Sequence, residues 1–212
     1  MNSIITIGRQ LGSGGKYVGE QLALRLGIPC YDKELINLAS RESGLDKAFF
    51  EKADEKSRFS VCGHFFGLHS GYMTGSTGNY LCNEALFKIQ SDVIRKLAGE
   101  SSCIFVGRCA DYILRDHRHC LKVFICADLP DRLERLMHER HLSEKDARLL
   151  LDQSDKKRAG YYNYYTNKIW GMASSYDLCL NSSAFGFEEL VRMIAERGMP
   201  SRQRPHIFTE HP

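Results

Sequence analysis

A glycine-rich run near the start of the chain, Gly12-Ser13-Gly14-Gly15-Lys16, has the residue types of a phosphate-binding loop. Backbone N–H groups in such a turn converge on an anion, and a following helix N-terminus adds partial positive charge. The usual form of this loop is Gly, four residues, then Gly-Lys followed by Ser or Thr. Counting back from Lys16, Gln10 stands at the first glycine position, and Tyr17 stands at that of the Mg²⁺-binding hydroxyl. Residues 12–17 are therefore candidates for binding nucleotide phosphates, and the alternative is a glycine-rich turn that binds nothing.

Polar residues directly follow the predicted strands. Arg9 follows the first strand, Asp32 the second, Arg108 the third and Asp128 the fourth. Because ligands of open parallel sheets bind beyond the carboxyl ends of the strands, such side chains can meet one ligand. Arginine suits planar, bidentate recognition of phosphate. We expect Arg9 and Arg108 to bind phosphate, whereas Asp128 is better interpreted as a surface charge.

A second charged cluster lies in the C-terminal half of the chain. A spacing of three places Asp152, Asp155 and Arg158 on one face of a helix. In one interpretation this is a solvated face whose ion pairs contribute only ~0.3–0.5 kcal/mol each. In the other it belongs to a lid whose cations close over a transferring phosphoryl group. Spacing alone leaves both open.

Aromatic residues follow this cluster, from Tyr161 to Tyr165 and at Trp170. Tyrosines can stack on a nucleotide base. Such a stripe more often packs a helix onto the body of a protein, and we favour packing.

Eight cysteines raise the possibility of a disulfide or zinc protein. No pair has the two-residue gap typical of zinc sites or redox pairs, so reduced thiols in an intracellular protein are favoured. His64 and His69 have no companion ligands, and we predict no metal site there.

Hydrophobic patterning predicts an α/β chain with a parallel sheet covered by helices on both faces. The expected strands cover residues 4–7, a brief segment after Gly27, and residues 103–106, 121–127 and 178–180. Helices are expected after the glycine-rich run, over 33–58, over 85–97, after the fourth strand, after a cap at Ser143, and over 188–197. Glycines at 63, 67, 71, 75 and 78 predict a long loop or flap over 61–80.

Length and charge narrow the function classes. The 212 residues suit a single domain, and a net charge of +3 is too small to argue for nucleic acid. We expect neither a leader peptide nor a membrane span, and we predict a cytoplasmic protein. Oligomeric state is not readable from these features.

Taken together, these residues resemble the cytidylate kinase-like family, relatives of the nucleoside monophosphate kinases. The resemblance extends from Ile4 to about Ile194, and its motifs are Gly8 to Gly15, Gly27 to Leu35, Val106 to Tyr112, Asp155 to Tyr162, and Tyr176 to Leu178. It implies a three-layer P-loop NTPase-type fold with a five-stranded parallel sheet. The implied domain covers 1–199, with an NMP-binding or flap region at 33–82, a lid at 140–170, and a tail at 200–212.

The resemblance also implies a reaction and roles for particular residues. The γ-phosphoryl group of ATP passes to CMP or dCMP, with Mg²⁺ as the second cofactor. Arg108 matches the arginine that holds the acceptor phosphate, and we place Asp32 and Asp111 on the same acceptor side. Asp155 and Arg158 match a lid pair that contacts the acceptor nucleotide, and Arg132 lies near the donor nucleotide.

The sequence departs from the family pattern at the phosphate loop. When the family pattern is aligned with this sequence without gaps, backwards from Gly27, its loop lysine falls on Gly15 and its Mg²⁺-binding hydroxyl residue falls on Lys16. Leu151 replaces an arginine, and Cys109 replaces the aspartate after Arg108. Arg9 or Lys16 could supply the missing cation, with Arg158 as a further catalytic candidate. Two alternatives stay open: a nucleotide-binding protein with little or no kinase activity, and a kinase with a non-nucleotide acceptor.

Overall fold

The computed structural model of the protein describes residues 2–32 and 77–198. The chain divides into two compact units, one formed by residues 1–33 and 97–212 and the other by residues 34–96. The helix expected over 33–58, most of the loop expected over 61–80, and the tail from residue 200 lie outside the described residues.

A five-stranded sheet forms the centre of the first unit. Its strands are β1 (Ile4–Arg9), β2 (Cys30–Tyr31), β3 (Cys103–Val106), β4 (Cys120–Cys126) and β5 (Leu178–Asn181). All neighbouring strands are parallel, in the order β2-β3-β1-β4-β5. The predicted α/β fold with a five-stranded parallel sheet is therefore confirmed. The fourth strand begins and ends one residue earlier than predicted, and the first continues to Arg9.

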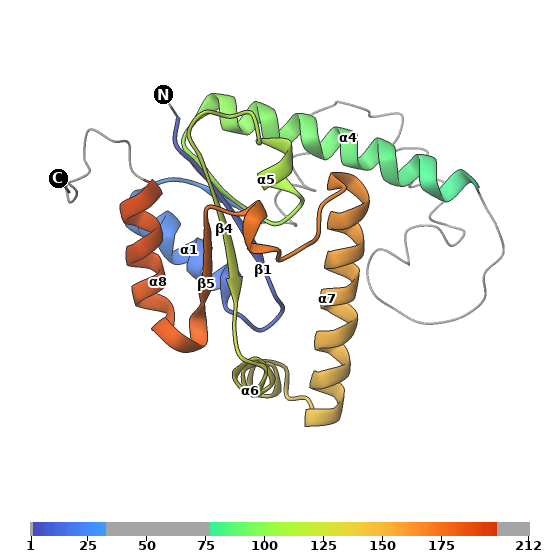
Figure 1. Ribbon diagram of the computed structural model, residues 1–212, viewed down its shortest axis with the longest axis vertical. Coiled ribbons are helices and arrows are strands. Elements are labelled where there is room, and N and C mark those ends of the chain that lie inside the picture. Colours follow the sequence, from blue (N-terminus) through green and yellow to red (C-terminus); the bar gives the residue numbers. More distant parts are fainter. Residues whose placement is uncertain (1, 33–76, 199–212) are drawn as a thin grey trace, which may run out of the picture. The chain divides into compact units, whose positions relative to one another are not determined.

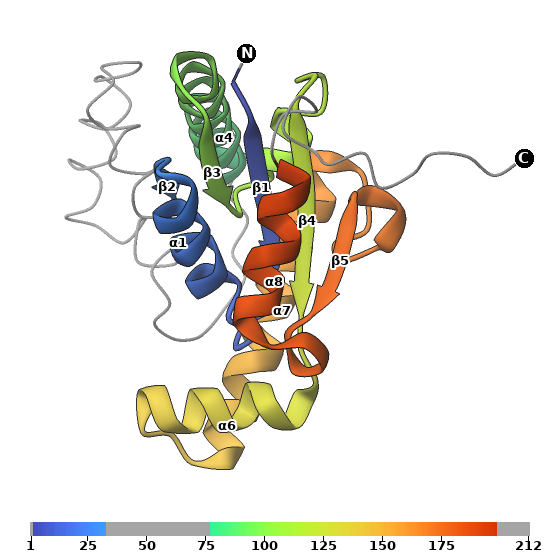
Figure 2. The same ribbon diagram turned by 90° about the vertical axis from the view of Figure 1, so that its left-hand side faces the viewer.

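The helices of this unit cover both faces of the sheet. Figure 1 shows α1 (Gly15–Leu26) and α8 (Ser182–Gly198) on one side of the strands, and α5 (Ala110–Ile113) and α7 (Glu144–Thr166) on the other. Figure 2 shows α1 and α8 side by side on their face. The last helix begins earlier than the predicted residue 188 and is kinked at Gly186, where φ is 71°.

Three further elements complete the described chain. Helix α6 (Leu129–Arg140) follows β4 and forms a hairpin with α7, and a 3-10 turn, η1 (Ala173–Ser175), precedes β5. Helix α4 (Thr77–Glu100) includes the helix predicted over 85–97. The helix begins at Thr77, so the prediction of a loop as far as Tyr80 was wrong. The glycine at position 78 lowers helix propensity only weakly and does not prevent the helix from beginning there.

Two hydrophobic cores can be traced entirely within the described residues. The larger joins the inward face of β1, including Ile5 and Ile7, to α1 and α8. The smaller lies between α6 and α7 and consists of Leu133, Leu136, Ala147 and Leu151, with Leu11 packed against it. The Leu11 side chain therefore attaches the turn after β1 to the α6–α7 hairpin.

The tyrosine stripe on α7 divides between core and surface. Tyr162 is buried, as packing predicts, whereas Tyr164 is 58% exposed. Trp170 packs edge-on against Phe124, with ring centroids 5.3 Å apart. Packing therefore accounts for part of the stripe only.

The six cysteines whose side chains are described are all free thiols: Cys30, Cys103, Cys109, Cys120, Cys126 and Cys179. Within the same ranges, no three His, Cys, Asp or Glu residues gather into a possible metal cluster. Nor does any described helix combine the length and apolarity needed to cross a bilayer.

Candidate phosphate-binding site

The glycine-rich run forms the turn between β1 and α1. Gly12 and Gly14 have φ values of 73° and 74°, in the left-handed region that favours glycine. A Cβ atom at Gly12 would lie 2.8 Å from the carbonyl oxygen of Arg132, so the backbones also approach too closely for a side chain. Gly14 caps α1, whose first helical residue is Gly15. The predicted strand–loop–helix arrangement is present.

Protein donors occupy the carbonyl oxygens of this loop. Each carbonyl from Arg9 to Gly14 accepts a hydrogen bond, at 2.7–3.0 Å. The donors, in the same order, are Arg158 Nη1, Ser13 Oγ, Arg132 Nε, Arg135 Nη1, Ser182 Oγ and the backbone N–H of Val18.

Several backbone N–H groups of the loop, in contrast to its carbonyls, have no hydrogen-bond partner among the described residues. Those of Gly12, Gly14, Gly15 and Tyr17 find no hydrogen-bond acceptor within the ranges that the structure describes. Two of them belong to the first turn of α1, where orphan N–H groups and the helix dipole favour an anion. The loop therefore presents donors, with its acceptors already satisfied, which is what phosphate binding requires.

Arg9 places the stem of its side chain beside the start of α1. Side chains alternate along a strand, so Arg9 shares the face of Ile5 and Ile7 that is covered by α1. A Cβ atom built on Gly15 would lie 2.5 Å from Arg9 Cβ and 2.9 Å from Arg9 Cγ. A Cβ atom on Gly107 would collide with Arg9 Nη1. The side chain therefore extends from the start of α1 to the turn after β3.

The turn after β3 has an unusual backbone. Gly107, Arg108 and Cys109 have φ values of 85°, 57° and 56°, so two non-glycine residues are in the left-handed region. Such conformations cost energy and concentrate at functional sites. The Arg108 guanidinium lies 5.5 Å from the centroid of the Tyr161 ring, within the range of a cation–π contact. Arg9 and Arg108 thus lie near the same turn, as their positions after adjacent strands predicted.

Lys16 extends in a different direction. Its Nζ is 2.8 Å from Asp32 Oδ2 and 3.9 Å from Glu20 Oε1. Its side chain is 58% exposed, whereas that of Asp32 is 13% exposed. The ammonium is directed toward the end of β2, and it ion-pairs with one of the residues expected on the acceptor side.

The α6–α7 hairpin fastens the loop through Leu11. Asp155 Oδ1 accepts the Leu11 N–H at 2.9 Å, and Arg132 Nε donates to the Leu11 carbonyl at 2.7 Å. Arg132 also pairs with Asp155 Oδ2. With the Leu11 side chain in the smaller core, the residue is held at its amide, its carbonyl and its side chain.

These contacts bear on the two interpretations of the second cluster. Asp152 pairs with Lys156 at 2.8 Å with both side chains exposed, which fits the solvated face. Asp155 and Arg158 do not fit it, because they bond to the loop backbone. Burial lowers the pKa of Arg158, and neighbouring Asp155 opposes this shift. Leu151, which replaces the family arginine, is a core residue of the hairpin.

The remaining predicted acceptor residue, Asp111, lies in the first turn of α5. Its carboxylate accepts the Tyr162 hydroxyl at 2.7 Å, and burial raises its pKa. Asp128, interpreted as a surface charge, is exposed and accepts from Asn181 Nδ2 at 2.9 Å. The acceptor roles expected for Asp32, Asp111, Asp155 and Arg158 stay predictions.

Arg135 and Ser182 also support the loop, and they were absent from the sequence-based candidates. Arg135 follows Arg132 by one helical turn, and Ser182 directly follows β5, so the position of each could have suggested a place near the site. Neither signal is specific, because exposed arginines on helices and serines after strands are common. Arg135 also lies 4.8 Å from the centroid of the Phe187 ring, which fixes its direction.

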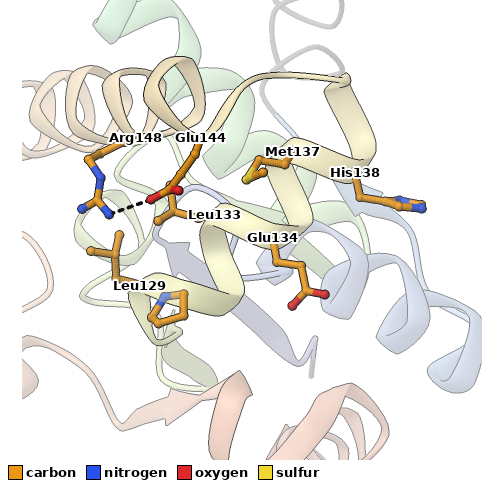
Figure 3. A pocket seen from close by; sticks show the side chains of 8 residues that line it. Leu129, Leu133, Glu134, Met137, His138, Glu144 and Arg148 are labelled. Atoms are coloured by element: carbon orange, nitrogen blue, oxygen red, sulfur yellow. Dashed lines mark hydrogen bonds and ion pairs between the residues drawn. The ribbon is translucent and has the colours of Figure 1, made fainter.

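A groove of about 540 Å³ lies between α6 and α7 (Figure 3). It is lined by Leu129, Pro130, Leu133, Glu134, Met137, His138, Glu144 and Arg148. Glu144 and Arg148 form an ion pair of 3.3 Å along its edge. None of the predicted site residues lines this groove.

The described residues fit the two expected cofactors unequally. Loop amides and Arg9 suit the phosphates of ATP. Mg²⁺ lacks its usual hydroxyl ligand here, because Lys16 occupies that position and its ammonium already neutralises Asp32. The described residues therefore do not fit the usual protein-bound Mg²⁺ site of such a loop.

Solved structures are similar to this chain to different degrees. An uncharacterized protein from Eubacterium ventriosum ATCC 27560 is 29% identical, with a TM-score of 0.69 over 91% of this chain and 96% of that chain. TT1252 from Thermus thermophilus is 16% identical, with a TM-score of 0.51 over 91% and 96% of the two chains. A shikimate kinase from Bacteroides thetaiotaomicron is 15% identical, with a TM-score of 0.48 over 92% and 96%.

The sequence itself points to one family. Among curated proteins, none matches the chain. The model of the cytidylate kinase-like family matches residues 4–184, which include the glycine-rich loop, the turn after β3 and the α6–α7 hairpin. With a match across most of its length, the chain belongs to the cytidylate kinase-like family.

Proposed function

We propose that this protein is a phosphotransferase that moves the γ-phosphoryl group of ATP to a small acceptor. CMP and dCMP are the first acceptors to test, because of the family to which the chain belongs. The observation that carries the proposal is the loop between β1 and α1, whose carbonyls are satisfied while four of its amides lack acceptors in the described structure.

In the proposed reaction, a phosphate oxygen of the acceptor attacks the γ-phosphorus of ATP. A new P–O bond forms, the bond to the β–γ bridging oxygen breaks, and ADP leaves. The loop amides bind the donor phosphates, and Arg108 binds the acceptor phosphate from the neighbouring turn. Phosphoryl transfer depends chiefly on positioning and charge neutralisation, and these residues supply both.

The residues of the α6–α7 hairpin act indirectly in this scheme. Arg132, Asp155 and Arg158 hold the loop backbone and so determine where its amides point. They are positioning residues in the described state, and contacts of Asp155 with an acceptor nucleotide would require it to exchange its present partners. We further propose a cytoplasmic location, where ATP is available and the free cysteines stay reduced.

The test is turnover by the purified protein with ATP, MgCl₂ and a panel of nucleoside monophosphates and small hydroxylated acceptors. Formation of ADP together with a phosphorylated acceptor supports the proposal, and Arg108→Ala should raise KM for the acceptor about tenfold or more. Arg95→Ala is a matched control, because its arginine is exposed and pairs only locally with Asp92. Absence of turnover with every acceptor would refute the proposal.

A second function is favoured by a specific observation. Gly15 stands in the usual lysine position, and Lys16 is paired with Asp32. A nucleotide-binding protein with little or no kinase activity would tolerate both features. Calorimetric binding of ATP or CMP without turnover would establish that function.

A further inference from the structure

We propose that Arg9 supplies the phosphate-binding cation of this loop. An ordinary phosphate loop has glycine at the position of Arg9 and lysine at the position of Gly15, so the two residue types are exchanged here. The inference rests on the proposed function only in taking this loop as a phosphate site. It decides between Arg9 and Lys16, the two candidates for the missing cation.

The exchange is visible in the numbering of the loop. With the usual lysine position at Gly15, the second glycine of the pattern falls on Gly14 and the first falls on Arg9. The chain thus has a cation where the pattern has glycine, and glycine where the pattern has a cation. The two departures are complementary.

The structure shows why the departures occur together. The stem of Arg9 occupies the space of a side chain at position 15, because Cβ there would lie 2.5 Å and 2.9 Å from Arg9 Cβ and Cγ. Carbon atoms in contact prefer about 3.5–4.0 Å. A lysine at position 15 is therefore incompatible with Arg9, and glycine is required.

The position of the guanidinium supports the role. It lies against Gly107, in the turn that carries Arg108, while the stem of the same side chain lies beside Gly15 at the start of α1. Arg158 Nη1 anchors the Arg9 carbonyl at 3.0 Å, which fixes the base of the side chain. Arginine presents several coplanar N–H donors, so one residue can bind two phosphate oxygens.

Lys16 is the weaker candidate. Its ammonium lies 2.8 Å from Asp32 and must leave that carboxylate before it reaches the loop. Leaving would also break the ion pair with Asp32, whose side chain is only 13% exposed.

The first test measures the binding of ATP and of inorganic triphosphate by calorimetry. Arg9→Ala should weaken both about tenfold or more, and Lys16→Ala should weaken them less than about threefold. Arg25→Ala is the matched control, because this exposed arginine lies in the last turn of α1. Unchanged affinity in Arg9→Ala, or a greater loss in Lys16→Ala, would overturn the proposal.

The second test restores the ordinary arrangement. Gly15→Lys alone should bind triphosphate poorly, because Arg9 fills the space that the lysine stem needs. The double variant Arg9→Gly/Gly15→Lys should bind within about threefold of the wild type. Failure of the double variant to bind better than Arg9→Gly would contradict the exchange.

A third measurement is independent of nucleotide binding and of kinase activity. Gly15→Ala should lower the midpoint of thermal unfolding by about 3–8 °C in the wild type, since overpacking strains the start of α1. In an Arg9→Gly background the same substitution should have little effect. Equal losses in both backgrounds would overturn the steric basis, whereas absence of turnover with every acceptor would refute only the proposed function.

Discussion

Replacement of Asp155 by alanine should destabilise the protein far more than its position on a charged helix suggests. Its two carboxylate oxygens bind the Leu11 amide and Arg132, and its side chain is 19% exposed. The Arg132 side chain is 9% exposed, so it would be left as a nearly buried cation without its partner. The Leu11 amide would lose its acceptor as well.

The magnitude follows from these burials. Breaking a buried ion pair by removing one partner costs about 3–5 kcal/mol, and an unsatisfied amide costs about 1–3 kcal/mol. Water can reach part of the Asp155 site and relieve both effects. We therefore expect Asp155→Ala to lower the free energy of unfolding by about 2–4 kcal/mol and the midpoint by about 5–15 °C.

The assay is thermal and urea unfolding followed by circular dichroism. Asp152→Ala is the matched control, because its pair with Lys156 is exposed and should contribute only ~0.3–0.5 kcal/mol. The variant Arg132→Met/Asp155→Leu, which removes both charges, should recover part of the loss. A difference of less than about 1 kcal/mol between Asp155→Ala and Asp152→Ala would refute this role of Asp155.

Three further predictions concern other parts of the structure. Gly14→Ala should lower the free energy of unfolding by about 1–3 kcal/mol, because φ is 74°, whereas Gly160→Ala, in open space on α7, should raise it by about 0.5–1 kcal/mol; urea titrations compare the two. Burial raises the pKa of Asp111 above 3.8, so the folded chain binds this proton more tightly and the contribution of Asp111 to stability falls as pH rises above that value. In thermal melts, the unfolding midpoint of Asp111→Asn should rise relative to that of the wild type as pH increases. A difference between the two midpoints that does not change with pH would contradict this. Thiol labelling should reach exposed Cys179 before buried Cys103, since burial raises the pKa of Cys103 to about 12; comparable rates for these two thiols would exclude this order.

Features that depend on neighbours in sequence were predictable. The apolar segments of the sheet predicted its strands, and Ser143 accepts the Asp146 N–H as a capping residue should. The glycine-rich run predicted a turn between β1 and α1, because two of its residues need left-handed backbone conformations. Arg108 after β3 could be placed because parallel strands bring their carboxyl ends to one edge.

One local prediction failed for a local reason. Glycines and polar residues predicted a loop as far as Tyr80, but α4 begins at Thr77. Intrinsic propensities are weak, of the order of 1 kcal/mol for glycine, and the rest of a helix can override them.

The sequence by itself determined that this chain has a parallel α/β sheet with a glycine-rich turn between its first strand and first helix, because periodicity and turn chemistry are local. Only the tertiary structure decided how the loop is held. Leu11 and Asp155 are 144 positions apart, and Arg9 and Arg158 are 149 apart, so no spacing reveals either contact. Spacing also does not reveal where the Arg9 and Lys16 side chains lie. Their positions depend on the space beside Gly15 and on the carboxylate of Asp32. Such contacts form only when strands and helices that are distant in sequence pack together.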